Sequence, residues 1–258
     1  MPAVSQAFAV IEEIHHLMSF HDPQSDVSRL NYYAYQQPVK VNPKTWHVLS
    51  CAQTISELSE GIFDITIAPL LIKSHLLPKI DSIFPTIFQH GIPDAIELLT
   101  HHFVRFLQPI AIDLGGIAKG YAVDQAAEVL QNHGVSDYVV NAGGDLRVGM
   151  SAEIIYLRHP QAPYQLLPLA KLRNAAMATS ARYFFYTRQG SRIVHPAKEA
   201  LAKLKGSISV FADECIVADA LTKVAGILKQ DAIPILKQFG AEACWFDKPI
   251  ANYQLMHS

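Results

Sequence analysis

The sequence predicts an α+β fold, a mixed α/β arrangement in which helices and strands follow one another without regular βαβ alternation. Half of the 258 residues are hydrophobic and 17% are charged, a composition typical of a globular chain with a sizeable core. Predicted strands gather between residues 138 and 211, with predicted helices before and after them. No stretch rich in Pro, Gly and Ser divides the chain, so residues 1–258 are expected to form a single domain.

The first elements show clear boundary signals. Apolar residues at helical spacing predict an amphipathic helix that ends at Met18. Residues 39–41 alternate in the manner of a short strand. Asn42 and Pro43 have the order of an N-cap and a first helical residue, and Gly61 is a stop signal for the helix that they begin.

The middle of the chain is predicted as short helices followed mainly by strands. Three prolines interrupt residues 71–100, which favours short helices there. Residues 103–107 and 110–114 are expected to be paired strands joined by a Gln-Pro turn, and a helix is expected at 117–132. Further strands are expected at 138–141, 146–148, 154–157, 182–187, 191–194 and 206–211.

The C-terminal part is predicted to be mainly helical. Asp213 is expected to be the N-cap of a strong helix that runs to Leu228. A helix at 231–239 and a strand at 241–246 are expected to follow. These elements complete the predicted α+β order.

Composition argues against several classes of function. A net charge of −2 gives no electrostatic footprint for nucleic acid. Three widely spaced cysteines form neither a zinc pattern nor a disulfide framework. No GxGxxG follows a first strand, which argues against a nicotinamide-binding Rossmann enzyme. We expect no transmembrane segment, and the sequence shows no signal-peptide pattern from which to predict a compartment.

One segment carries most of the chemical information, the run Asp113-Leu-Gly-Gly-Ile-Ala-Lys-Gly-Tyr-Ala-Val-Asp124. Its glycines precede a predicted helix whose first turn carries Lys119. Glycines let a ligand approach the backbone closely, and helix N-terminal amides with a lysine favour phosphate. Phosphate binding and a plain tight turn both fit this pattern.

Two other polar segments allow alternative interpretations. The diglycine that joins Asn141 to Asp145 favours a hairpin with a capped turn. Asp219 and Thr222 are three residues apart and therefore share a face of an apolar helix. They either cap a neighbouring loop or supply oxygen ligands to Mg²⁺.

These three segments occur with SDVSRLN (25–31), GIFDITIAPL (61–70) and ATS (178–180) in the order seen in ApbE-type flavin transferases. The sequence resembles that family over residues 6–246, nearly its whole length. The resemblance implies a bilobed ApbE-like fold with mixed sheets, flanking helices and a flavin site between the lobes. It also implies that FAD is the substrate and Mg²⁺ the metal.

The implied reaction is Mg²⁺-dependent transfer of FMN from FAD to a threonine of an acceptor protein, a redox protein subunit, with release of AMP. Hydrolysis of FAD to FMN and AMP, and FAD binding without catalysis, are the alternatives. The resemblance implies catalytic roles for Lys119 and Asp219. The implied flavin contacts are Phe20, His21, Ile62, Phe63, Asp64, Asp113, Lys119 and Ile193. The implied metal ligands are the carbonyl of Gly116 and the side chains of Asp219 and Thr222.

The sequence departs from the family pattern in four places. The strand with a Met-Gly-Thr motif that precedes the first helix in family members is missing from this sequence. Phe20 and His21 stand where a tyrosine is usual. His195 replaces an aspartate before a proline, where it is either an acid/base or a turn histidine. Lys223 stands where many members have threonine; an inward-pointing ammonium there competes with Mg²⁺, and an outward-pointing one leaves the metal site unaffected.

Overall fold

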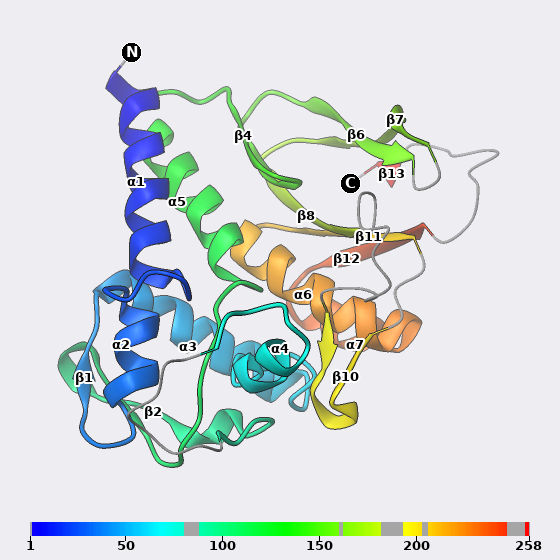
Figure 1. Ribbon diagram of the computed structural model, residues 1–258. Helices are drawn as coiled ribbons and strands as arrows, with labels where there is room; N and C mark the ends of the chain where they lie inside the picture. The colour runs from blue at the N-terminus through cyan, green and yellow to red at the C-terminus, as the bar shows by residue number, and fades with distance from the viewer. Residues whose placement is uncertain are drawn as a thin grey trace. The chain divides into compact units, whose positions relative to one another are not determined.

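The computed structural model describes residues 2–79, 88–159, 162–181, 193–202, 206–246 and 256–257. The chain divides into two compact units (Figure 1). Unit 1 comprises residues 1–11, 119–193 and 201–258, and unit 2 comprises residues 12–118 and 194–200. The single-domain prediction, like the predicted position of the flavin site, stays a prediction. Within the described ranges, no helix has the length and apolar character needed to cross a membrane.

Unit 2 contains mainly helices and one small antiparallel sheet of order β1-β3-β2. The first helix, α1 (Pro2–Met18), begins in unit 1 and ends in this unit. The unit's other helices are α2 (Asp26–Tyr33), α3 (Pro43–Leu58) and α4 (Ala68–Lys73), with 3-10 turns η1 (Pro93–Ala95), η2 (Thr100–His102) and η3 (Pro196–Lys198). Its strands are β1 (Val39–Lys40), β2 (Ile96–Leu98), β3 (Phe103–Phe106) and β9 (Val194–His195), which pairs with β10 (Ala200–Leu201).

The boundary signals of α3 are confirmed. The Asn42 side chain accepts a hydrogen bond from the backbone N–H of Lys44 at 2.9 Å, and Pro43 is the first helical residue. The helix ends at Leu58, and Gly61 follows with φ +76°, a conformation that favours glycine. The expected short helices between residues 71 and 100 are confirmed in part by η1, but β2 was not predicted.

The predicted strand at 110–114 is wrong. Its backbone is held by other groups: the Asn31 side chain accepts from the N–H of Ile112 at 2.7 Å and donates to its carbonyl at 2.9 Å. The N–H of Asp113 donates to the carbonyl of Ile65. Ile110 forms only an isolated bridge with Gln89, the rest of residues 110–114 is not in a strand, and β3 pairs with β1 and β2 instead.

Unit 1 is built on a five-stranded antiparallel sheet of order β12-β11-β8-β5-β4. Its strands are β4 (Val139–Ala142), β5 (Asp145–Val148), β8 (Ala175–Ala181), β11 (Ser207–Ala212) and β12 (Glu242–Phe246). A second sheet has the order β13-β7-β6, formed by β6 (Glu153–His159), β7 (Ala162–Leu172) and β13 (Met256–His257). The helices are α5 (Ala118–Asn132), α6 (Cys215–Leu228) and α7 (Ile233–Gln238), with the 3-10 turn η4 (Lys229–Ala232).

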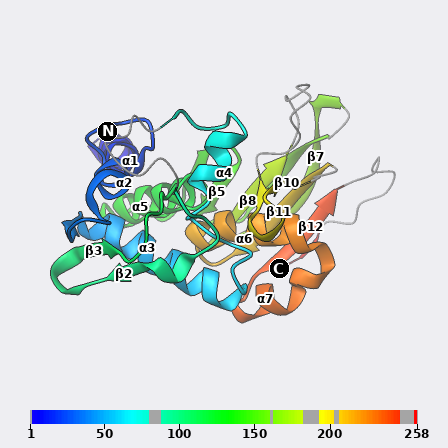
Figure 2. The same ribbon diagram turned by 60° about the horizontal axis from the view of Figure 1, so that its bottom comes forward.

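Helix α6 covers the five-stranded sheet of unit 1, where it packs against β8 and β11, and α7 packs against β12 (Figure 2). The core between the strands includes Leu146, Val148, Met177 and Phe246, all buried. Strand β8 was not predicted, because its sequence is rich in alanine, which has low strand propensity. Its position between β11 and β5 compensates for that low propensity through pairing on both sides. The predicted strand 182–187 and the start of the predicted strand 191–194 lie outside the described residues.

Candidate active site

The residues implied as site residues are divided between the two units. Unit 2 contains Phe20, His21, Ile62, Phe63, Asp64, Asp113 and Gly116. Unit 1 contains Lys119, Ile193, Asp219 and Thr222. The polar groups of unit 1 form one connected network.

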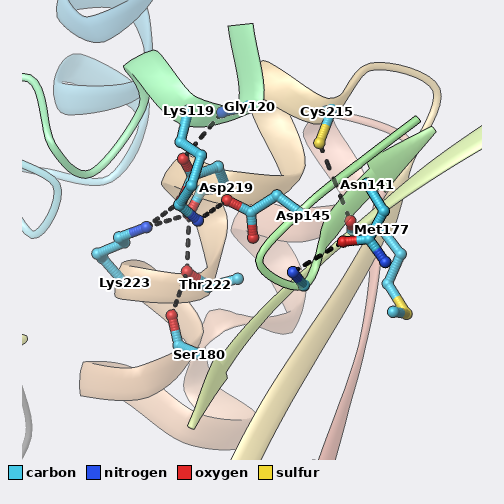
Figure 3. Close-up of polar contacts among 11 residues, drawn as sticks. Lys119, Gly120, Asn141, Asp145, Met177, Ser180, Cys215, Asp219, Thr222 and Lys223 are labelled. Carbon is cyan, nitrogen blue, oxygen red and sulfur yellow. Dashed lines mark hydrogen bonds and ion pairs between the residues drawn. The ribbon is translucent and has the colours of Figure 1, made fainter. Parts of the chain in front are cut away.

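Asp219 is the centre of this network (Figure 3). It lies on α6 and is 1% exposed. One carboxylate oxygen, Oδ2, accepts a hydrogen bond of 3.1 Å from the backbone N–H of Gly120. The other, Oδ1, is paired with the ammonium of Lys223, which also donates to the backbone carbonyl of Asp219 at 2.9 Å. Both oxygens of this buried carboxylate therefore have partners, as burial of a charge requires.

The approach of α5 to Asp219 depends on Gly120. A Cβ atom at this position would lie 2.2 Å from the carbonyl oxygen of Cys215 and 2.8 Å from the Cβ of Asp219. Those separations are far inside van der Waals contact. Gly120 therefore allows close packing of α5 on α6, which brings its N–H within hydrogen-bond distance of Asp219.

Thr222 is also engaged within the unit. Its hydroxyl donates to the backbone carbonyl of Asp219 at 2.7 Å and accepts from the Ser180 hydroxyl at 2.9 Å. As arranged, Asp219 and Thr222 do not fit a resident Mg²⁺, because the Lys223 ammonium already neutralises the carboxylate. In the described part of the chain, no cluster of three or more His, Cys, Asp or Glu has the arrangement of a metal site. Magnesium binding stays a prediction.

Lys119, in the first turn of α5, forms an ion pair with Asp145 (Figure 3). The Asp145 side chain is 2% exposed and the Lys119 side chain is 45% exposed. Burial lowers the pKa of Lys119, with Asp219 raising it and Lys223 lowering it further. Water still reaches much of the side chain, so this lowering is moderated by solvent screening. The Lys119 ammonium thus lies beside a buried carboxylate, on a side chain that is partly open to solvent.

The diglycine between β4 and β5 places Asp145, and the hairpin expected there is confirmed. Gly143 and Gly144 have φ of +67° and +104°, values that a two-residue hairpin turn requires. The Asn141 side chain accepts from the N–H of Gly144 at 3.0 Å. The pairing of Asp145 with Lys119 was not predicted, although both residues belong to segments that resemble the ApbE family.

The N-terminus of α6 corrects another prediction. Asp213 was expected to be the N-cap, but the N-cap residue is Glu214, whose side chain makes no capping hydrogen bond. The first two backbone amides of α6 donate instead to the Asp124 side chain on α5. The N–H of Cys215 does so at 2.9 Å and the N–H of Ile216 at 2.8 Å. Arg147 also donates to Asp124, at 2.6 Å. Asp124, the last residue of the glycine-rich segment, therefore positions the helix that carries Asp219.

In unit 2, two of the implied flavin contacts pair with each other. The rings of Phe20 and His21 lie 6.3 Å apart at 78°. Phe63 is buried, and its N–H donates to the Ser59 hydroxyl at 3.0 Å. Ile62 beside it is partly exposed.

The acidic members of the set in unit 2 have different environments. Asp64 is 5% exposed and accepts from the N–H and the hydroxyl of Thr66, at 2.6 and 2.8 Å. Burial raises the pKa of Asp64, and these hydrogen bonds oppose the increase. Asp113 is partly exposed. Gly116 is also partly exposed, two residues before α5.

Ile193 and His195 are close in sequence but belong to different units. Ile193, in unit 1, is buried, and its carbonyl accepts from the N–H of Ala202 at 2.7 Å. His195, in unit 2, ends β9 and precedes a 3-10 turn. Burial lowers the pKa of His195, with Lys198 adding to the effect. The question whether His195 is an acid/base or a turn residue stays open.

Comparison with known proteins identifies the family. The ApbE family model matches residues 2–245. The chain belongs to the ApbE family. Relatives named FAD:protein FMN transferase include one from Vibrio cholerae, 27% identical over 230 residues, covering 82% of this chain and 69% of the relative. Another is from Haemophilus influenzae, 26% identical over 252 residues, covering 86% of this chain and 71% of the relative.

Solved structures of ApbE proteins share the fold. The flavin transferase ApbE from Vibrio cholerae superposes with a TM-score of 0.76 at 21% identity, covering 94% of this chain and 83% of that one. The ApbE protein from Thermotoga maritima gives a TM-score of 0.81 at 24% identity, with 94% and 85% covered. The predicted α+β, ApbE-like fold class is therefore confirmed, and the named relatives are transferases.

Proposed function

We propose that this chain is a transferase that moves FMN from FAD to a threonine of an acceptor protein and releases AMP. The observation that carries the proposal is the family match over residues 2–245, together with relatives that are named FAD:protein FMN transferase. The polar network of unit 1 supports it, because phosphoryl transfer depends mainly on positioned charge.

In the proposed reaction, the threonine Oγ of the acceptor attacks the phosphorus that belongs to the FMN half of FAD. A new O–P bond forms, the bond from that phosphorus to the bridging oxygen breaks, and AMP leaves with that oxygen. The threonine hydroxyl proton passes to solvent or a nearby base. No redox change occurs, so FAD and the acceptor are the only reactants needed.

Lys119 is the cation that we assign to the pyrophosphate. Its side chain is 45% exposed, which leaves room for a phosphate oxygen to approach it. Asp145 fixes its position in the absence of FAD. A positioned cation that meets charge developing on a phosphoryl oxygen accelerates transfer without reorganisation at the moment of reaction. The flavin itself is assigned to Phe20, His21, Ile62, Phe63, Asp64, Asp113 and Ile193.

The resemblance also implies a magnesium requirement, with Gly116, Asp219 and Thr222 as ligands, and the proposed transfer does not depend on it. When bound, Mg²⁺ supplies charge neutralisation at the pyrophosphate. The ion pair of Lys223 with Asp219 works against its binding. No step of the proposed reaction is therefore assigned to the metal.

The test is incubation of the protein with FAD and, as acceptor, a redox protein subunit that carries an exposed threonine. AMP and FMN are measured by chromatography, and flavin on the acceptor is detected by fluorescence in a denaturing gel. We expect one AMP per flavin attached, with no attachment to an acceptor whose target threonine is replaced by alanine. Lys119→Met should lower the rate by at least about 100-fold, the scale of losing one stabilising group at a transition state.

The same assay separates the alternatives. Release of both AMP and FMN with an unlabelled acceptor would show a hydrolase in place of a transferase. Binding of FAD with no AMP under any condition would refute the proposed enzyme and leave a flavin-binding protein. Lys237→Thr, which removes an exposed lysine of α7, is the charge control and should leave the rate unchanged.

A further inference from the structure

The Asp219 carboxylate already has a cation beside it, supplied by its own helix. Lys223 lies one turn after Asp219 on α6, and its ammonium contacts both the carboxylate and the backbone carbonyl of Asp219. The Lys223 side chain is 22% exposed, while that of Asp219 is 2% exposed. This pair differs from an ordinary surface pair of i,i+4 residues, because one partner is almost completely buried.

An ammonium and a divalent metal exclude one another at such a carboxylate. Mg²⁺ requires oxygen ligands in near-octahedral geometry, and a lysine ammonium has three donors and no lone pair to offer. A second cation at the same oxygen would also be repelled by the first. The other carboxylate oxygen, Oδ2, accepts a hydrogen bond from the N–H of Gly120, and the Thr222 hydroxyl is shared between Ser180 and the carbonyl of Asp219.

We propose that the Lys223 ammonium is the resident cation of the Asp219 site and takes the place of a divalent metal there. The chain then uses a covalently attached single charge where a metal-dependent protein binds a free ion. The part of this inference that concerns catalysis rests on the proposed function; the part that concerns metal binding does not.

Other charged groups near the site are consistent with this assignment. Lys119 is ion-paired with Asp145, and Asp219 also raises its pKa against the lowering by burial, but the ammonium that contacts the Asp219 carboxylate is that of Lys223. Each lysine forms an ion pair with one buried carboxylate, Lys119 with Asp145 and Lys223 with Asp219. The positive and negative charges of these two pairs therefore cancel. Removal of Lys223 would leave Asp219 as a buried charge with a single amide donor, and that site would then attract an external cation.

The first experiment measures metal binding directly, with Mn²⁺ as the probe and electron paramagnetic resonance as the readout, with and without FAD. We expect the wild-type protein to retain no Mn²⁺, even when the Mn²⁺ concentration is about tenfold above the millimolar dissociation constants of weak carboxylate sites. Lys223→Thr replaces the ammonium with a hydroxyl oxygen and should retain about one Mn²⁺ per chain when FAD is present. Lys223→Arg keeps the cation and should behave as the wild type.

The second readout is thermal stability, measured by circular dichroism with Mn²⁺ or with EDTA. Lys223→Thr should melt below the wild type in EDTA and recover when Mn²⁺ is added, because an ion that binds only the folded state stabilises it. The melting temperature of the wild type and of the control Lys237→Thr should not respond to Mn²⁺. This arm needs no turnover, so it remains informative if the proposed transfer is not observed.

Two results would overturn the inference. One is retention of one Mn²⁺ per wild-type chain that is lost in Asp219→Asn. The other is failure of folded Lys223→Thr to bind Mn²⁺ with FAD present. If Lys223→Thr does not fold, the wild type and Lys223→Arg decide, since either one binding Mn²⁺ at Asp219 refutes the assignment. If the wild type releases AMP, the rate of AMP release should be the same in EDTA and in Mg²⁺. A rate at least tenfold lower in EDTA would contradict the assignment of Lys223 as the resident cation.

Discussion

Gly120→Ala is the substitution for which the structure predicts the largest effect from the smallest chemical change. The added methyl group would lie 2.2 Å from the Cys215 carbonyl oxygen, 2.6 Å from its carbonyl carbon and 2.8 Å from the Cβ of Asp219. Two of these three atoms are backbone, so no side-chain rotation relieves the contact. Helices α5 and α6 must move apart, and the hydrogen bond from Gly120 to Asp219 must lengthen with them.

Two opposing terms set the magnitude. Overpacking a close contact costs up to about 3 kcal/mol. Alanine is favoured over glycine within a helix by about 1 kcal/mol. The net loss is therefore about 2 kcal/mol, which lowers the melting temperature by about 4–8 °C for a protein of this size.

Thermal and urea unfolding, followed by circular dichroism, measure this loss. Gly115→Ala is the matched control, because its methyl group would meet only the end of the Asp113 side chain, at 3.1 Å. We expect the control to unfold within about 1 kcal/mol of the wild type, as surface substitutions without a packing defect do. A Gly120→Ala protein as stable as the wild type, or more stable, would show that helix propensity outweighs packing and would refute the reasoning.

Three further predictions concern buried polar groups. Asp124→Ala removes the cap of α6 and the partner of Arg147, and should cost about 3 kcal/mol in urea unfolding, whereas Asp213→Ala should cost less than about 0.5 kcal/mol. Equal midpoints for these two variants would contradict the capping assignment. Asp64, whose pKa burial raises above 3.8, favours the folded state below pH 3.8, and this contribution is lost as the pH rises through the folded-state pKa. The wild type should therefore lose stability relative to Asp64→Asn as the pH rises. A difference in unfolding free energy that does not change with pH would contradict the raised pKa of Asp64. Burial raises the pKa of Cys215 well above its usual range, so iodoacetamide at pH 8 should label it only after unfolding, which peptide mass mapping can check.

Much of the fold followed from local signals. The cap at Asn42, the helical spacing that ends at Met18 and the diglycine turn are short-range patterns, and the structure confirms each of them. Residues 110–114 were misassigned because their hydrogen-bond partners are distant in sequence: Asn31 is 81 residues away from Ile112. No local pattern indicates such a partner, and an apolar run is predicted as a strand when its backbone is in fact held by a side chain.

The same limit applies to the N-terminus of α6. Asp213 has the right residue type and nearly the right place for an N-cap, so sequence reasoning favoured it. The acceptor is Asp124, which is 91 residues from Cys215. Asp124 could have been noticed only as the last residue of the glycine-rich segment, and that segment was interpreted as a ligand-binding motif.

That segment shows how a family motif and a ligand contact can differ. Within it, Gly120 permits the approach of α5 to α6, Asp124 caps α6, and Lys119 presents an exposed positive charge. Two of these three residues thus hold in place the helix that carries Asp219 and Lys223. A motif can therefore identify the family while some of its residues serve packing and capping. The feature that we expect to set the metal requirement, Lys223, lies outside this motif, and its meaning depends on where its ammonium points, which only the structure shows.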